Sequence, residues 1–292
     1  MDLGGSRRGT DMGPSAVRIA GLETALREQG HDFEDLGNVS VEDPSSVAVG
    51  DKSARYLKQI ASSCADIRDT VAGALDSERF PIVVGGDHSI AVGTVAGVSD
   101  HFDRLGESIG LLWFDAHGDM NTPESSPSGN IHGMPLAACL GRGDDALTAL
   151  GRRCPLVSTE NVAVVGVRSL DTAERRIVED LGVRVYTMRE IDARGLYEVM
   201  GEALEIVTRG TAGFHISFDV DGTDPVVATG VGTPVPGGLT YRESHLFMEL
   251  AAESKRAVSL EITEINPILD THNRTADFAV GLCLSALGQS VL

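Results

Sequence analysis

The sequence predicts an α/β fold in which helices cover both faces of a parallel sheet. Short apolar runs alternate with helical stretches along the 292 residues, which is typical of strands buried on both faces. Polar residues suited to chemistry follow several of these runs. No change in composition marks a boundary, so we expect a single domain over residues 1–292.

The elements follow in order along the chain. Residues 1–13 are rich in glycine and charge and predict a loop, after which Pro14 opens a helical apolar stripe that ends at Gly30. Residues 37–50 resemble a loop, and residues 52–76 predict a second helix. The apolar runs that predict strands are 81–84, 109–114, 162–167, 183–186, 214–218 and 257–260. Further helices are predicted from about 89, from about 172, at 241–253 and at about 272–288.

Composition narrows the class of protein. The net charge of −19 argues against nucleic-acid or anionic membrane partners and favours a cationic ligand, although acidic surfaces commonly serve solubility alone. The four cysteines are scattered, which indicates a reducing compartment. Their spacing fits neither a disulfide framework nor a structural zinc site. No segment approaches the ~18 apolar residues of a membrane span. We therefore expect a cytoplasmic protein.

The polar residues that follow the predicted strands are expected to converge. They lie at or just past the ends of different strands, and such ends share one edge of a parallel sheet, where ligands bind. These residues are His88, Asp115, Arg168, Asp219 and Glu264.

Six of the polar residues suit a pair of metal ions. If the extended conformation continues past residue 114, Asp115, His117 and Asp119 project to one side. The full candidate set is His88, Asp115, His117, Asp119, Asp219 and Asp221. Four carboxylates and two imidazoles without cysteine favour manganese, iron or cobalt over structural zinc. Taken singly, the motif around His88 also fits a strand-to-helix turn, and the Asp-x-Asp motif also fits a capping turn.

A polar stretch after this motif, residues 121–132, has too many small polar side chains for an ordinary connection. We interpret it as a loop that binds a substrate.

In combination, these motifs resemble the ureohydrolases, and within them the arginases. The motifs shared with ureohydrolases are GGDHS (85–89), DAHGD (115–119) and SFDVDG (217–222). Those that point to arginases are NTP (121–123), SGNIHG (128–133), GTP (232–234), GGLTYRE (237–243) and EINP (264–267). The resemblance covers nearly the whole chain.

The resemblance implies a three-layer α/β/α fold with a central, mostly parallel sheet, and two manganese ions per subunit. One ion would be held by His88, Asp115, Asp119 and Asp219, and the other by His117, Asp115, Asp219 and Asp221. The family reaction is hydrolysis of L-arginine to L-ornithine and urea, in which a metal-bridging hydroxide attacks the guanidinium carbon. Family members are commonly homotrimers or homohexamers.

Three residues would act in catalysis. Asp119 would orient the hydroxide, and Glu264 would pair with guanidinium nitrogens, whose planar fork a carboxylate matches. His132 would carry a proton to the leaving amine, because its ordinary pKa lies near 6.5. A structural hydrogen bond is the alternative role for His132.

Five residues resemble the family's substrate contacts. Asn121, Ser128 and Asn130 would hold the substrate carboxylate, Asp171 would meet its α-amino group, and Thr233 belongs to the matching GTP motif. From sequence alone, a helix N-cap is the more ordinary role for Asp171.

The chain departs from the family pattern at three places. Ser169 stands where an acidic residue is common, and Thr223 replaces a usual leucine, a packing change of about 1 kcal/mol. Family members also usually begin with a strand that is absent before Met1, and its loss would expose a sheet edge or a core face.

The open alternatives for function are another guanidino substrate (agmatine, guanidinobutyrate or formiminoglutamate) or a catalytically silent metal-binding homologue.

Overall fold

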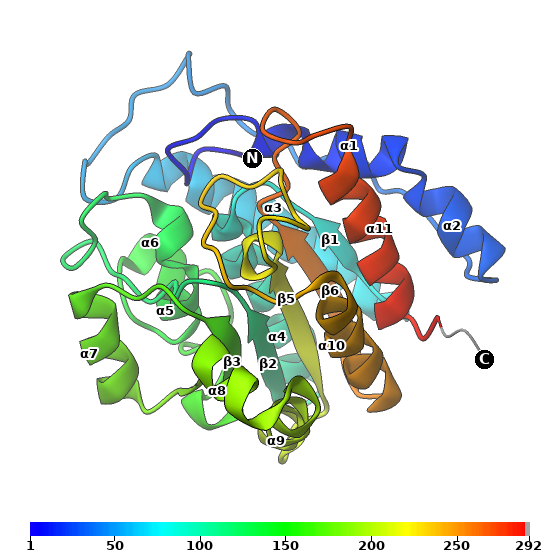
Figure 1. The fold of residues 1–292 in the computed structure, drawn as a ribbon. Coiled ribbons are helices and arrows are strands. Elements are labelled where there is room, and N and C mark those ends of the chain that lie inside the picture. Colours follow the sequence, from blue (N-terminus) through cyan, green and yellow to red (C-terminus); the bar gives the residue numbers. More distant parts are fainter. Residues whose placement is uncertain (290–292) are drawn as a thin grey trace.

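A computed structural model describes residues 1–289, which form a sheet of six parallel strands surrounded by helices (Figure 1). The strands are β1 (Ile82–Val84), β2 (Ile109–Phe114), β3 (Val162–Val167), β4 (Arg184–Thr187), β5 (Gly213–Asp219) and β6 (Ala257–Thr263). Their order across the sheet is β1-β6-β5-β2-β3-β4. Every predicted strand is present, and the predicted parallel sheet is confirmed.

Helices lie between successive strands, before the first strand and after the last one. They are α1 (Gly13–Ile19), α2 (Leu22–Glu28), α3 (Leu57–Asp76), α4 (Ala91–Arg104), α5 (Pro135–Cys139), α6 (Asp145–Thr148), α7 (Thr172–Leu181), α8 (Met188–Arg194), α9 (Leu196–Thr208), α10 (Tyr241–Glu253) and α11 (Arg274–Ala286). Short 3-10 turns occur at Thr10–Met12, His88–Ile90, Ile131–Gly133, Thr159–Asn161 and Val220–Gly222.

Alternation of side chains along the buried strands divides the core into two clusters. On β2, Leu111 and Trp113 pack with α3 and α4, whereas Leu112 and Phe114 pack with α9, α10 and α11 on the other face. Helices therefore cover both faces of the sheet, which confirms the three-layer α/β/α fold (Figure 1).

The helices differ from the sequence prediction in several places. The single helix expected after Pro14 is divided at Gly21, whose φ of 89° lies in the left-handed region. Helix α3 begins at Leu57 instead of residue 52, because Tyr56 also adopts a left-handed conformation. Helices α8 and α9 were not predicted, although buried Leu196, Val199, Met200, Ala203 and Val207 give α9 a helical period.

Strand β1 lies at an edge of the sheet and pairs with β6. A cavity of about 1600 Å³ lies beside it, lined in part by residues 80–85 and 31–39. The chain start crosses the end of β1, where the Asp87 N–H donates to the Met1 carbonyl (2.9 Å). Within residues 1–289, no helix combines the length and apolar character that a membrane crossing requires.

Candidate active site

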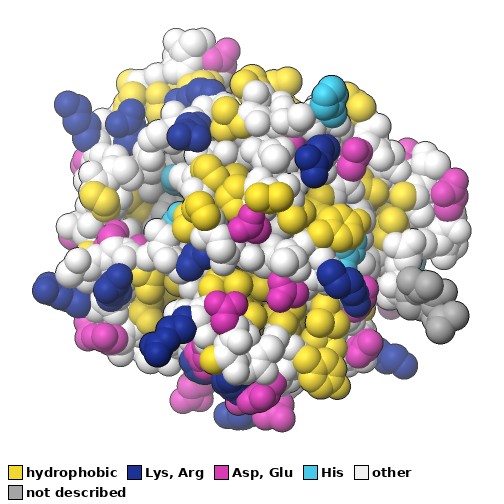
Figure 2. Space-filling view, in the orientation of Figure 1, with side chains coloured by type: hydrophobic (Ala, Val, Ile, Leu, Met, Phe, Trp, Pro, Cys, Tyr) yellow, Lys and Arg dark blue, Asp and Glu magenta, His cyan; other side chains and the backbone are white. Residues whose placement is uncertain are grey.

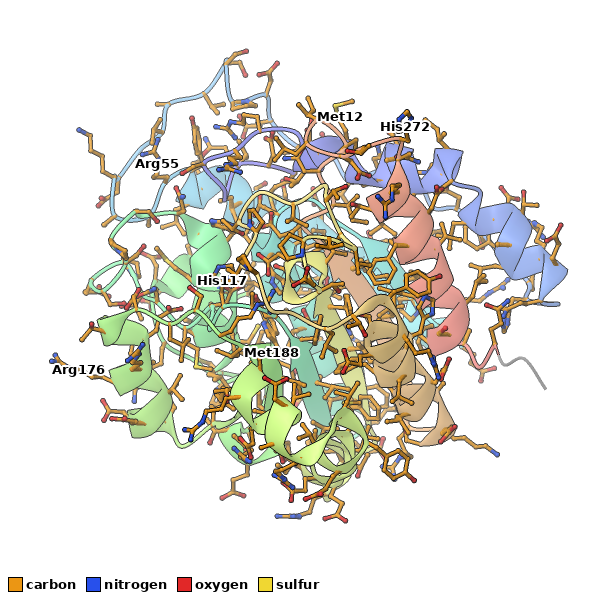
Figure 3. The ribbon with its side chains drawn as sticks, in the orientation of Figure 1. Met12, Arg55, His117, Arg176, Met188 and His272 are labelled. Carbon is orange, nitrogen blue, oxygen red and sulfur yellow. The ribbon has the colours of Figure 1, made fainter. Side chains whose placement is uncertain are left out.

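The carboxyl ends of four neighbouring strands supply the candidate site. His88 follows β1, Glu264 follows β6, Asp219 ends β5, and Asp115 follows β2. These strands are adjacent and parallel, so residues far apart in sequence meet at one edge, as predicted. Figure 3 labels His117 near this edge, and Figure 2 shows histidine atoms recessed within a hollow on the same face.

His88 lies at the centre of three buried carboxylates. Its Nδ1 atom is 3.2 Å from Asp115 Oδ2, 3.1 Å from Asp119 Oδ2 and 3.1 Å from Asp219 Oδ2. Burial lowers the pKa of His88, but these carboxylates outweigh it and raise the pKa well above its usual value. Among the described residues, His88 Nδ1 forms no hydrogen bond.

A second group shares Asp115 with the first. His117 Nδ1 lies 3.4 Å from Asp115 Oδ1 and 3.2 Å from Asp221 Oδ2. One oxygen of Asp115 therefore faces each group. The potential ligand atoms within each group lie within 4.8 Å of one another. The first of these groups is His88, Asp115 and Asp219, and the second is Asp115, His117 and Asp221. We call the six predicted residues, which include Asp119, the metal centre.

The chemistry of the metal centre fits divalent cations. Burial and the neighbouring carboxylates raise the pKa of Asp119 to about 7 and that of Asp219 well above its usual value. Positive charge would relieve this repulsion. Oxygen and imidazole donors without sulfur, together with the unpaired Nδ1 of His88, are the ligands such an ion requires.

The DAHGD motif is a turn, which corrects the expectation of a continued strand. Strand β2 ends at Phe114, and Asp119 adopts a left-handed conformation with φ of 52°. The His117 N–H donates to Asp115 Oδ1 (2.7 Å), which tightens the turn. As a result, Asp119 faces His88 while His117 faces Asp221.

His132 and Glu264 form a pair beside the metal centre. His132 Nδ1 lies 3.0 Å from Glu264 Oε1, and that oxygen also accepts a hydrogen bond from the His88 N–H (3.0 Å). Burial lowers the pKa of His132, but the hydrogen bond with Glu264 and its negative charge raise it to about 9. Glu264 also has a left-handed backbone, with φ of 63°.

Residues 121–132, which we call the substrate loop, carry three of the predicted substrate contacts. Asn121 Nδ2 donates to Asp171 Oδ2 (2.9 Å), and Asn130 Nδ2 donates to Ser6 Oγ (2.6 Å). The exposed Ser128 accepts a hydrogen bond from the Asn130 N–H (3.2 Å).

Two other predicted residues make contacts that the sequence only partly indicates. Asp171 caps α7 through hydrogen bonds from the N–H groups of Ala173 and Glu174, so the N-cap alternative is confirmed. Thr233 donates to Asp221 Oδ2 (2.7 Å), which attaches its loop to the metal centre.

Arg168 lies at a strand end as predicted, but its guanidinium binds backbone carbonyls. It donates to the carbonyls of Asp221 (2.8 Å), Gly222 (2.8 Å) and Val235 (2.7 Å). Arg168 therefore joins the turn that carries Asp221 to the loop of Thr233.

Sequence reasoning missed a buried polar set behind His88, namely His215 and Ser217 on β5 and Ser259 and Glu261 on β6. Alternation of polar and apolar residues within strands that should be apolar on both faces was the available signal. Ser6, which binds Asn130, carried no such signal because it lies in an irregular loop.

Comparison with known proteins places this geometry in a family. The model of the arginase family matches residues 1–288. The chain belongs to the arginase family. The arginase of Bacillus caldovelox is 49% identical over 293 residues, covering 100% of this chain and 97% of that protein. Its native structure superposes with a TM-score of 0.95, at 48% identity and the same coverage. The arginase of Brevibacillus brevis is 47% identical, covering 100% of this chain and 96% of that protein.

Proposed function

We propose that the site hydrolyses L-arginine to L-ornithine and urea with two manganese ions per subunit. The enzyme is a hydrolase that cleaves a carbon–nitrogen bond of the arginine guanidino group, as its family relatives indicate. One observation of the structure carries the proposal furthest: two ligand groups share Asp115, beside the pair formed by His132 and Glu264.

The metal centre would hold the ions in two sets. The first would comprise His88, Asp115, Asp119 and Asp219, and the second His117, Asp115, Asp219 and Asp221. Oxygen-rich donors with one imidazole in each set favour manganese. When bound, two such ions lower the pKa of a water molecule and provide hydroxide near neutral pH.

The chain's own residues would direct the reaction. Asp119 accepts a hydrogen bond from the attacking water and orients it toward the guanidinium carbon. Glu264 pairs with guanidinium nitrogens and fixes the plane of that group. His132, whose hydrogen bond with Glu264 raises its pKa, donates a proton to the leaving amine of ornithine.

The substrate loop would recognise the amino-acid end of arginine. Asn121, Ser128 and Asn130 donate to the carboxylate, and Asp171 accepts from the α-amino group, with Thr233 at the rim. Asn121 already donates to Asp171, so the two contacts would be made side by side. Ser169 supplies no second negative charge for the amino group, so amino-group binding would rest on Asp171.

A urea-release assay over a panel of guanidino compounds, with and without added manganese, tests the proposal. We expect manganese-dependent release from L-arginine and far less from agmatine. Faster turnover of agmatine, guanidinobutyrate or formiminoglutamate would reassign the substrate. No hydrolysis of any of them by protein that carries two metal ions would favour the silent metal-binding homologue.

We further propose that residues 1–292 act as one catalytic domain in a cytoplasmic homotrimer or homohexamer. The support is the family match over residues 1–288. Light scattering coupled to size-exclusion chromatography would give the mass, and a monomer would contradict the assembly.

A further inference from the structure

A stripe of buried polar residues runs along strands β5 and β6 toward the metal centre. Parallel pairing places His215 beside Ser259, Ser217 beside Glu261, and Asp219 beside Thr263; all six share one face of the sheet and are at most 3% exposed. The opposite face of the same strands is apolar and packs in the core. Buried polar groups are costly without partners, and hydrogen bonds join most of the stripe, although His215 Nε2 and Glu261 Oε2 form none with the described residues.

The stripe connects to the metal centre through two short contacts. His88 Nε2, the ring nitrogen that points away from the carboxylates, lies 2.8 Å from Ser217 Oγ. Ser217 Oγ donates to Glu261 Oε1 (2.6 Å). His88 is also stacked on Trp113, with ring centroids 4.2 Å apart, so the ring has little freedom to turn.

Glu261 is fully buried, yet it is held as a carboxylate. Burial raises its pKa, but the nearby His215 imidazole and the hydrogen bond from Ser217 lower the pKa below its usual value. His215 Nε2 is 3.5 Å from Glu261 Oε1, which is long for a hydrogen bond, so the contact is chiefly electrostatic. His215 is itself anchored by Ser259 Oγ, 2.8 Å from Nδ1.

The positions of protons along this chain follow from donor and acceptor chemistry. A carboxylate only accepts, so the Ser217 hydroxyl must donate its hydrogen to Glu261. Ser217 then has only lone pairs to offer His88, which requires a proton on His88 Nε2. Metal binding requires the neutral imidazole, which carries one proton, so Nδ1 is left with the free lone pair that a metal ion needs.

We propose that Glu261 is a positioning residue that acts through Ser217 to hold His88 in the Nε2-protonated form, with Nδ1 aimed into the metal centre. The inference rests on the proposed metal centre. Glu261 touches neither substrate nor ion, and its effect is on the affinity and order of metal binding at the His88 group. An amide at residue 261 could donate to Ser217, reverse the hydroxyl and remove this constraint.

The test compares manganese affinity in four variants: Glu261→Gln, Ser217→Ala, the double variant, and Ser259→Ala as a matched control. Ser259→Ala removes a hydroxyl from the same stripe without breaking the link between Glu261 and His88. Affinity is measured by competition with a chelator of known manganese affinity, and bound metal is counted after dialysis. Thermal unfolding of the metal-free proteins checks their folding.

We expect Glu261→Gln and Ser217→Ala each to weaken manganese binding about 10- to 100-fold, the usual cost of losing a partner of a ligand. The double variant should bind manganese no more weakly than the single variant with the lower affinity, because Glu261 acts through Ser217. Ser259→Ala should bind manganese within about twofold of the wild type. At saturating manganese, the KM for arginine should be unchanged.

Wild-type manganese affinity in Glu261→Gln, or losses that multiply in the double variant, would overturn the inference. If Glu261→Gln does not fold, Ser217→Ala decides alone, and unchanged affinity there has the same consequence. Failure of the wild type itself to bind manganese would instead contradict the proposed metal centre. The two failures are therefore distinguishable.

Discussion

The metal centre and the substrate loop are neighbours along the chain, but different forces hold them. The side chains of the metal centre extend from strand ends and, apart from His117, are buried. The substrate loop is held by short-range bonds, such as Ser125 Oγ to Asn121 Oδ1 (2.8 Å), and by bonds to other loops, such as Asn130 Nδ2 to Ser6 Oγ (2.6 Å). Sheet geometry thus fixes the chemistry, while contacts within and between loops fix the recognition. Changes in the loop should alter specificity without disturbing metal binding.

The largest effect that would test this contrast is expected for Asp219→Asn. Loss of a residue that hydrogen-bonds to a metal ligand weakens metal binding about 10- to 100-fold. Asp219 is itself a ligand proposed for both ions, so its replacement should weaken manganese binding by more than that. Because burial and the neighbouring carboxylates raise the pKa of Asp219, the ionised group is unfavourable without metal. The metal-free variant should therefore melt at a higher temperature than metal-free wild type, with little further gain from manganese.

Asp224→Asn provides the control for Asp219→Asn. Asp224 accepts from the Gly237 N–H (2.8 Å) and belongs to neither ligand group. Calorimetry with and without manganese should show normal stabilisation by metal in this variant. Equal stabilisation in Asp219→Asn would contradict the role of that residue.

His132→Asn should lower kcat by roughly 10²–10⁴, the range for loss of a general acid, and leave metal affinity unchanged. A pH effect should accompany it. The pKa of His132 is raised to about 9, so its pairing with Glu264 stabilises the wild type fully below about 6.5 and is lost as pH rises through about 9. The variant should lack that part of the pH dependence in its unfolding profile. A normal kcat would restrict His132 to its structural hydrogen bond.

Asp171 offers two substitutions that separate its two roles. Asparagine caps a helix about as well as aspartate, so Asp171→Asn should keep stability but raise the KM for arginine roughly tenfold or more through loss of a charged hydrogen bond. Asp171→Ala should show the same raised KM as Asp171→Asn, and its free energy of unfolding should also fall by about 1 kcal/mol. Urea release and denaturant unfolding measure the two effects. If the KM for Asp171→Asn stays normal, Asp171 is only a cap.

The metal centre could be predicted from sequence to the extent that it depends on strand ends. Asp115, Asp219 and His88 follow apolar runs, and parallel pairing alone brings such residues together. The turn at Asp119 could not be predicted, because its left-handed backbone is imposed on a residue type that ordinarily adopts other conformations. Helix α9 and the polar face of β5 both carry periodic patterns in the sequence, so both were open to prediction.

Contacts between loops were beyond prediction for a different reason. Ser6 and Asn130 are 124 residues apart, and both lie in irregular segments without a period to reveal which side chain faces which. Their proximity follows only from the completed fold, which brings the chain start over the end of β1 and against the substrate loop.

The smallest effect in the comparison is expected for Ser6→Ala. The serine hydroxyl fixes the Asn130 amide, and a neutral hydrogen bond contributes about 1 kcal/mol, so the KM for arginine should rise about fivefold. Because Asn130 is proposed to bind the substrate carboxylate, the slow turnover of agmatine, which lacks that group, should not change. The ratio of kcat/KM for the two substrates is the measurement. An equal loss of kcat/KM for arginine and agmatine would show that Ser6 supports the whole substrate loop. Ser6 would then not act on recognition of the substrate carboxylate alone.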